Sequence, residues 1–100
     1  MNPASEPDPV RVRLPEVMDL ESAEVLAQDL LALRGCPVVL DAAGVERLGG
    51  LGLQVLLSAR RTWREDHLHF AVVDASDAFQ ADLALLGAST LYVSNGTPQS

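Results

Sequence analysis

Two short apolar runs, separated by a longer stretch with helical periodicity, constrain the fold of this chain most strongly. The runs are residues 38–40 and 71–73. Such runs, closed by a turn residue, are typical of strands covered on both faces of a sheet. Strands that alternate with helices pair in parallel through right-handed crossovers. The sequence therefore predicts one α/β domain with a mixed, mainly parallel sheet of about four strands and three helices.

The first half of the chain predicts a strand and a helix before the first apolar run. Residues 10–14 alternate apolar and charged side chains, as in a strand near a sheet edge, and Pro15 limits further pairing. Asp19 is placed to cap a helix, and Gly35 to end it with a positive φ. Between them an apolar stripe recurs at three- and four-residue steps: Leu20, Ala23, Leu26, Ala27, Leu30 and Leu33.

The second half predicts a further βα unit after a glycine-rich turn. Gly49, Gly50 and Gly52 lead into a helix expected over residues 51–64, and residues 67–73 are expected to form an inner strand. Ser76 is placed to cap a third helix. That helix carries Phe79, Leu83, Leu85 and Leu86, with Gly87 as its stop. Residues 90–93 are expected to add an edge strand.

Composition sets the limits of the domain and of its partners. We expect a flexible segment over residues 1–9, one domain over 10–94 and a polar tail over 95–100. Apolar residues are 48% of the chain and aromatic residues 4%, so Leu, Val and Ala must build the core. We find neither a signal peptide nor an apolar stretch of about 20 residues, and therefore expect a cytoplasmic protein without direct membrane insertion.

The charge balance argues against nucleic acid and anionic membranes as partners. The net charge is −7, from 14 acidic residues against seven Arg and no Lys. Binding phosphates requires a basic face, which this composition does not provide. The single Cys36 has no second Cys for a disulfide or a shared metal, and we expect it to be a small buried hydrophobe.

No pattern in the sequence indicates catalysis, and we expect no cofactor. His67 and His69 would share one face of a strand, but no third metal ligand accompanies them at a plausible spacing. Asp41 ends a predicted strand, where α/β enzymes often place carboxylates. Without a partner group, capping of the next turn is the better interpretation. The glycine-rich segment lacks the Lys and Ser/Thr of a P-loop.

The order of elements and the string VVLDAAGVERLGGLGLQVLL resemble the STAS domain, the family of bacterial anti-sigma factor antagonists. That family shows a strand ending in Asp, a small-residue turn, a Val, a hydrophobic step, and then Asp-Ser-Ser-Gly-Leu-Gly opening a helix. The resemblance covers residues 10–88. The matching residues are Asp41, Gly44, Val45, Leu48, Gly52, Leu53 and Leu56.

The departures from the family pattern fall on its regulatory residues. Gly49 stands at the family's Asp, Gly50 at its phosphorylated Ser, and Leu51 at its second Ser. In similar proteins, phosphorylation of that Ser releases a GHKL-type kinase that acts as an anti-sigma factor. Gly50 has no hydroxyl to accept a phosphate.

The resemblance implies a regulatory protein–protein interaction module. Its partner would be a GHKL-type kinase or anti-sigma factor, or a chemotaxis or two-component protein. The expected partner-binding residues lie on the second helix and the turn before it: Gly49, Gly50, Leu51, Gln54, Ser58 and Arg61. Arg61 is suited to meet a carboxylate on the partner.

Several alternatives remain open from the sequence. Gly49 and Gly50 can be required by a left-handed turn, or they can leave a flat docking surface. Leu51 can be exposed or buried. The chain can also be a STAS-like subunit of a phospholipid ABC transport complex, or a small-ligand or metal-dependent module that uses Asp41 and the two histidines.

Overall fold

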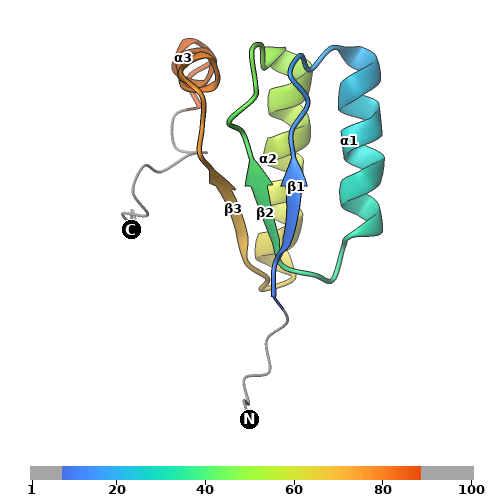
Figure 1. Ribbon diagram of the computed structural model, residues 1–100. Helices are drawn as coiled ribbons and strands as arrows, with labels where there is room; N and C mark the ends of the chain where they lie inside the picture. Colours follow the sequence, from blue (N-terminus) through green and yellow to red (C-terminus); the bar gives the residue numbers. More distant parts are fainter. Residues whose placement is uncertain (1–7, 89–100) are drawn as a thin grey trace.

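The computed structural model describes residues 8–88, in which strands and helices alternate along the chain (Figure 1). The elements are β1 (Val10–Arg13), α1 (Leu20–Ala32), β2 (Val38–Asp41), α2 (Gly49–Glu65), β3 (Phe70–Val73) and α3 (Asp77–Leu85). The α/β class is therefore confirmed. Within these residues no helix is both long and apolar enough to cross a membrane.

The three strands form one parallel sheet in the order β1-β2-β3. Val10 lies opposite Val38, which in turn lies opposite Phe70. The predicted parallel pairing is confirmed, and β1 lies at an edge as expected. The sheet of residues 8–88 has three strands, not four, and contains no antiparallel pair. The expected fourth strand, residues 90–93, lies outside the described part of the chain, as do residues 1–7 and the predicted polar tail.

The hydrophobic core lies between the sheet and the two helices α1 and α2. At its centre Val38 and Leu40 of β2 are fully buried, and Leu56 of α2 is fully buried as well. Trp63, near the end of α2, donates a 2.6 Å hydrogen bond from Nε1 to the carbonyl of Cys36. Leu, Val and Ala make up most of this core, as the composition predicts, while Cys36 itself is only half-buried.

Helices α1 and α3 begin at the residues that the sequence predicts. The Asp19 side chain accepts a 2.9 Å hydrogen bond from the backbone N–H of Ser22. Ser76 caps α3 by accepting from the N–H of Phe79 at 3.0 Å. These bonds satisfy backbone donors that the first turn of a helix leaves unpaired. Gly35 and Gly87, with φ of 98° and 72°, follow the ends of the two helices.

The expectation that the inner strands are covered on both faces is wrong. Right-handed crossovers between strands in sequential order place both connecting helices on the same side of a sheet. The opposite side carries Arg11, Arg13 and Asp41, and Val39 there is half-buried. Figure 1 views the sheet from this side, with α2 behind it. An apolar run of three residues does not distinguish a covered face from a half-exposed one.

Several boundaries and burial predictions also differ. Helix α2 begins at Gly49, so the glycines lie inside its first turn, not before it. Strand β3 begins at Phe70 and is an edge strand within residues 8–88. The apolar residues predicted for the first and third helices are not all buried. Leu20, Leu85 and Leu86 are exposed, whereas Leu83 is buried.

The Ser76 side chain provides a test of how α3 is attached. Its Oγ donates a 2.6 Å hydrogen bond to the carbonyl of Val45 and also accepts from Phe79 N–H. Ser76→Ala removes both bonds and is expected to lower the free energy of unfolding by about 1–2 kcal/mol. Ser76→Asp keeps an acceptor for the cap but cannot donate to Val45, and should lose less. Urea denaturation of the three proteins measures this order, which equal stability would contradict.

Candidate functional site

The turn that leads into α2 is held by the loop between β1 and α1. The backbone N–H groups of Glu46 and Arg47 both donate to the carbonyl of Glu16, at 2.7 Å and 3.0 Å. Met18 N–H donates to the carbonyl of Arg47 at 3.0 Å, and Val17 forms a parallel bridge with Arg47. Two segments about 30 residues apart in the chain are thus fixed side by side at the carboxyl end of the sheet.

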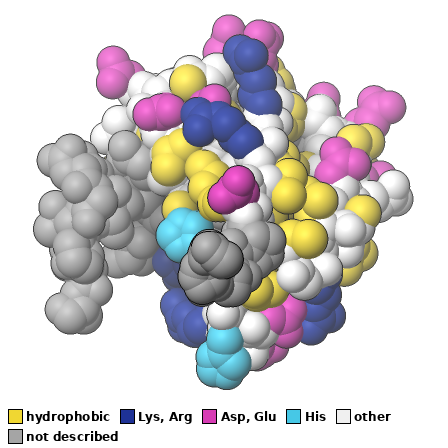
Figure 2. All heavy atoms as spheres, turned by 60° about the horizontal axis from the view of Figure 1, so that its bottom comes forward, with side chains coloured by type: hydrophobic (Ala, Val, Ile, Leu, Met, Phe, Trp, Pro, Cys, Tyr) yellow, Lys and Arg dark blue, Asp and Glu magenta, His cyan; other side chains and the backbone are white. Residues whose placement is uncertain are grey.

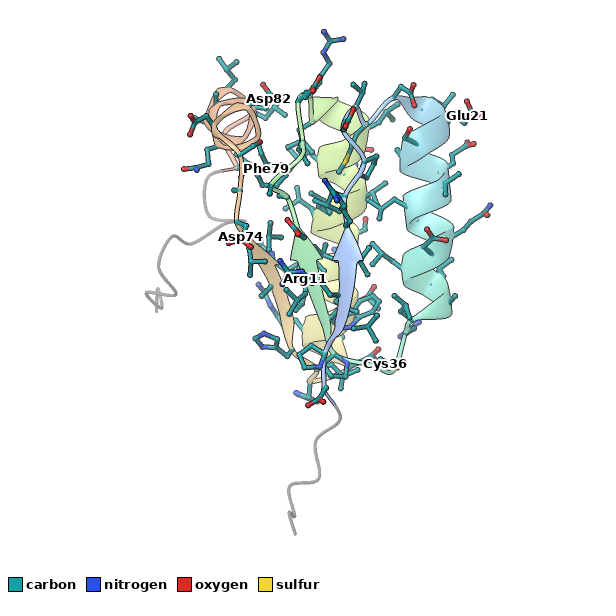
Figure 3. The ribbon with its side chains drawn as sticks, in the orientation of Figure 1. Arg11, Glu21, Cys36, Asp74, Phe79 and Asp82 are labelled. Atoms are coloured by element: carbon teal, nitrogen blue, oxygen red, sulfur yellow. The ribbon has the colours of Figure 1, made fainter. Side chains whose placement is uncertain are left out.

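The start of α2 is held by a carboxylate from α3. Leu48, the residue that precedes the helix, has no side-chain capping bond of its own. Its backbone N–H donates to Oδ2 of Asp82 at 2.8 Å. Figure 3 shows Asp82 on α3 near the start of α2. Because a helix N-terminus carries partial positive charge, a carboxylate is favourable there.

The three glycines of this turn have different structural requirements. Gly49 has a φ of 70°, so a side chain there would be strained. A Cβ on Gly52 would lie 2.5 Å from Sδ and 2.8 Å from Cβ of Met18, which is buried. A Cβ on Gly50 would meet no atom within 4 Å. Of the three, Gly49 is required by its left-handed backbone conformation, and Gly52 is required by close packing against Met18. Neither requirement applies to Gly50.

The sequence-predicted docking residues lie on the exposed side of α2. Leu51 is 47% exposed, which settles the question of its burial. Gln54, Ser58 and Arg61 are exposed one, two and three turns further along. The structure therefore places these side chains, with Gly50, on one solvent-facing surface. We name this set, Gly50, Leu51, Gln54, Ser58 and Arg61, the α2 surface.

One edge of the α2 surface borders an apolar groove between α1 and α2. The groove has a volume of about 380 Å³. Leu51, Gln54 and Ser58 line it, whereas Arg61 does not. The floor includes Ala23 of α1 and Trp63 of α2, both of which are largely buried.

The contacts of the Asp41 side chain support its interpretation as a cap of the following turn. Its Oδ1 accepts a 2.9 Å hydrogen bond from the N–H of Ala43, and its Oδ2 lies 3.0 Å from the guanidinium of Arg11. These two contacts, the backbone bond first, hold the pKa of Asp41 below its ordinary value. The second carboxylate on Arg11 is that of Asp74, at 3.1 Å (Figure 3). A carboxylate kept ionised by such partners is poorly suited to proton transfer.

The two histidines do not form a metal site with other described residues. Both are exposed and precede β3, and His67 lies in a turn with a φ of 59°. Figure 2 shows the two side chains, in cyan, at separate places on the surface. Within residues 8–88 no group of three potential metal ligands occurs. The expectation that the pair shares a strand face is wrong because the chain turns before β3 begins.

Comparison with protein families identifies the chain at the level of its domain. A family model described as "Mlab, STAS domain" matches residues 1–93. The chain belongs to the STAS domain family. No curated protein and no solved structure gives a significant match. STAS domains mediate protein–protein interactions and are generally non-catalytic binding modules, which agrees with the exposed α2 surface of this STAS domain.

Sequence reasoning missed the role of Asp82 in this STAS domain. Asp82 lies three residues after Phe79 and one before Leu83, two residues that are buried. A carboxylate so close to an apolar stripe needs a hydrogen-bond partner, and this was the available signal. Its partner, Leu48 N–H, lies 34 residues away and is found only in the tertiary structure.

Gly50 and Gly52, both in the first turn of α2, give a matched pair of variants. Gly52→Ala forces a methyl group against Met18 and is expected to lower the free energy of unfolding by about 1–3 kcal/mol. Gly50→Ala adds the same methyl group in open space within a helix, so stability should be unchanged or higher by up to about 1 kcal/mol. Urea denaturation distinguishes the two, and equal losses would contradict the packing described for Met18.

Proposed function

We propose that this STAS domain is a non-catalytic regulatory module that binds a signalling protein of the bacterial cytoplasm through the α2 surface. The partner is a GHKL-type kinase acting as an anti-sigma factor, or a chemotaxis or two-component protein. The observation that carries the proposal is the exposure of Leu51 beside Gly50 at the start of α2, on a turn held rigid by hydrogen bonds. A pre-ordered surface loses little entropy on binding.

The proposal includes a specific change in regulation. Gly50 stands at the position of the family's phosphorylated Ser, so this module binds its partner without being switched by phosphorylation there. Gly50 lies in α2 without a positive φ and has open space around it. Neither backbone conformation nor steric hindrance therefore requires glycine here, which supports the loss of the hydroxyl as the effect of replacing Ser. A serine Cβ at this position would meet no atom within 4 Å.

A second candidate is a STAS-like subunit of a phospholipid ABC transport complex. The description of the matching family model names Mlab and mentions neither a kinase nor a sigma factor. The same α2 surface would then face a subunit of the transporter. The identity of the bound partner distinguishes the two candidates.

A pull-down of the tagged protein from lysate of its own cells, followed by mass spectrometry, tests the proposal. We expect a GHKL-type kinase or anti-sigma factor that stays bound to the wild type when ATP is added. Gly50→Ser is expected to become phosphorylated and to release the kinase, whereas the control Gly50→Ala stays bound. Recovery of transporter subunits would favour the second candidate. A phosphate mapped to Ser58 of the wild type would show that the register with the family is wrong.

Arg61 provides a test of the surface itself. Arg61→Glu reverses the charge of an exposed side chain on α2 and is expected to weaken the complex about tenfold and to reduce its dependence on salt. Arg61→Gln, the control, removes the charge alone and should have an intermediate effect. Titration of the purified partner at two salt concentrations measures both. Unchanged affinity would exclude Arg61 from the interface.

A further inference from the structure

The groove between α1 and α2 has exposed leucines on both of its rims. Large leucine side chains stand on both rims: Leu20 and Leu31 on α1 are 59% and 68% exposed, and Leu51 on α2 is 47% exposed. Between the rims the floor contains small side chains, among them Ala27 and Ala59. Exposed leucines around an apolar depression are typical of a surface that another molecule covers.

The dimensions of the groove match a helix. Leu20 and Leu31 are 11 residues apart, which places them on the same side of α1 about three turns, or about 16 Å, from each other. A helix laid between α1 and α2 would contact the rim leucines and approach the alanines of the floor at the usual interhelical distance of about 8–10 Å. An extended acyl chain would fill the floor but leave the three rim leucines in water.

The charges around the groove indicate the chemistry of that helix. Helix α1 has no basic residue between Leu20 and Ala32, and of its three carboxylates only Glu24 lies at the groove, since Glu21 and Asp29 line a separate depression beside Val12 and Arg13. Glu24 lines the groove and has no ion-pair partner within residues 8–88.

The basic side chain at the far end of the groove, Arg34, is already paired with Asp66 at 3.0 Å. The wall formed by α2 is uncharged, with Leu51, Gln54, Val55, Ser58 and Thr62. The groove therefore has one carboxylate, that of Glu24, on its α1 side and no charged side chain on its α2 side.

We propose that this groove binds an amphipathic helix of the partner protein, with an apolar stripe on the groove floor and a Lys or Arg that faces Glu24. This inference rests on the proposed function, because the groove shares Leu51, Gln54 and Ser58 with the α2 surface. Helix binding in an apolar groove is a recurrent mode of recognition.

Site-specific photocrosslinking in the protein's own cells identifies the occupant. A benzophenone amino acid replaces Leu31 on the groove rim or, as control, Leu85 on α3, which is 83% exposed. We expect position 31 to crosslink to a partner segment whose sequence has an apolar stripe at helical spacing and a basic residue on one flank, and position 85 not to capture it. Crosslinks from position 31 to a second copy, to a non-helical segment or to no protein would overturn the proposal.

A synthetic peptide of the captured segment then tests the charges. Trp63 is the only tryptophan and lines the groove, so its emission reports binding directly. Glu24→Lys is expected to weaken binding about fivefold, and replacing the facing basic residue of the peptide by Glu should restore it. Leu31→Asp should weaken binding at least about tenfold, and Leu85→Asp should leave it unchanged. Binding insensitive to Glu24→Lys and Leu31→Asp, or emission changes with a fatty acid but not with the peptide, would overturn the proposal.

The outcomes separate this inference from the proposed function. If Leu31→Asp retains a signalling partner in the pull-down while Arg61→Glu loses it, the α2 surface stands and the groove proposal is wrong. If the helix captured at position 31 belongs to a transporter subunit, the groove proposal stands and the partner class changes.

Discussion

The parallel pairing of three short strands is the constraint on which the rest of this structure depends. The central strand β2 buries Val38 and Leu40 completely, and its neighbours align with it residue by residue. Because the strands follow one another in sequence order, the right-handed connections place α1 and α2 on the same side. The groove between the helices follows from this arrangement, as does the fact that neither α1 nor α2 covers the opposite side of the sheet.

The same topology brings together the segments that hold the start of α2. Parallel strands all end at one edge of the sheet, so the loops after β1 and β2 emerge side by side, where Glu16 and Met18 bond to the turn before α2. The close approach of Met18 to Gly52 and the bond from Leu48 to Asp82 then fix the first turn of the helix. The start of α2 is thus held in place by two other parts of the chain, the loop after β1 and helix α3.

Electrostatics gives this acidic protein its distinct surfaces. Arg11 and Arg34 are engaged by neighbouring carboxylates, so their charges are largely neutralised locally. Arg61 lies on α2, outside the groove lining, and Glu24 lines the groove on α1. A partner that covers both the α2 surface and the groove would therefore need an acidic group to face Arg61 and a basic group to face Glu24, which is a stronger basis for specificity than apolar area alone.

The sequence by itself determined the alternation of elements, the capping residues Asp19 and Ser76, and the resemblance to the STAS family. These are local properties, set by side chains within a few residues of one another. The register with the family pattern, on which the proposed role of Gly50 depends, is likewise read along the chain.

The tertiary structure alone decided which faces are covered. Leu20 and Leu83 look equivalent in a helical pattern, yet one is exposed and the other buried, because burial depends on which element packs against each face. The separate requirements of Gly49, Gly50 and Gly52 likewise depend on backbone conformation and on Met18, 34 residues before Gly52. The groove and the Asp82 contact exist only where distant segments meet, and no local pattern specifies which segments those are.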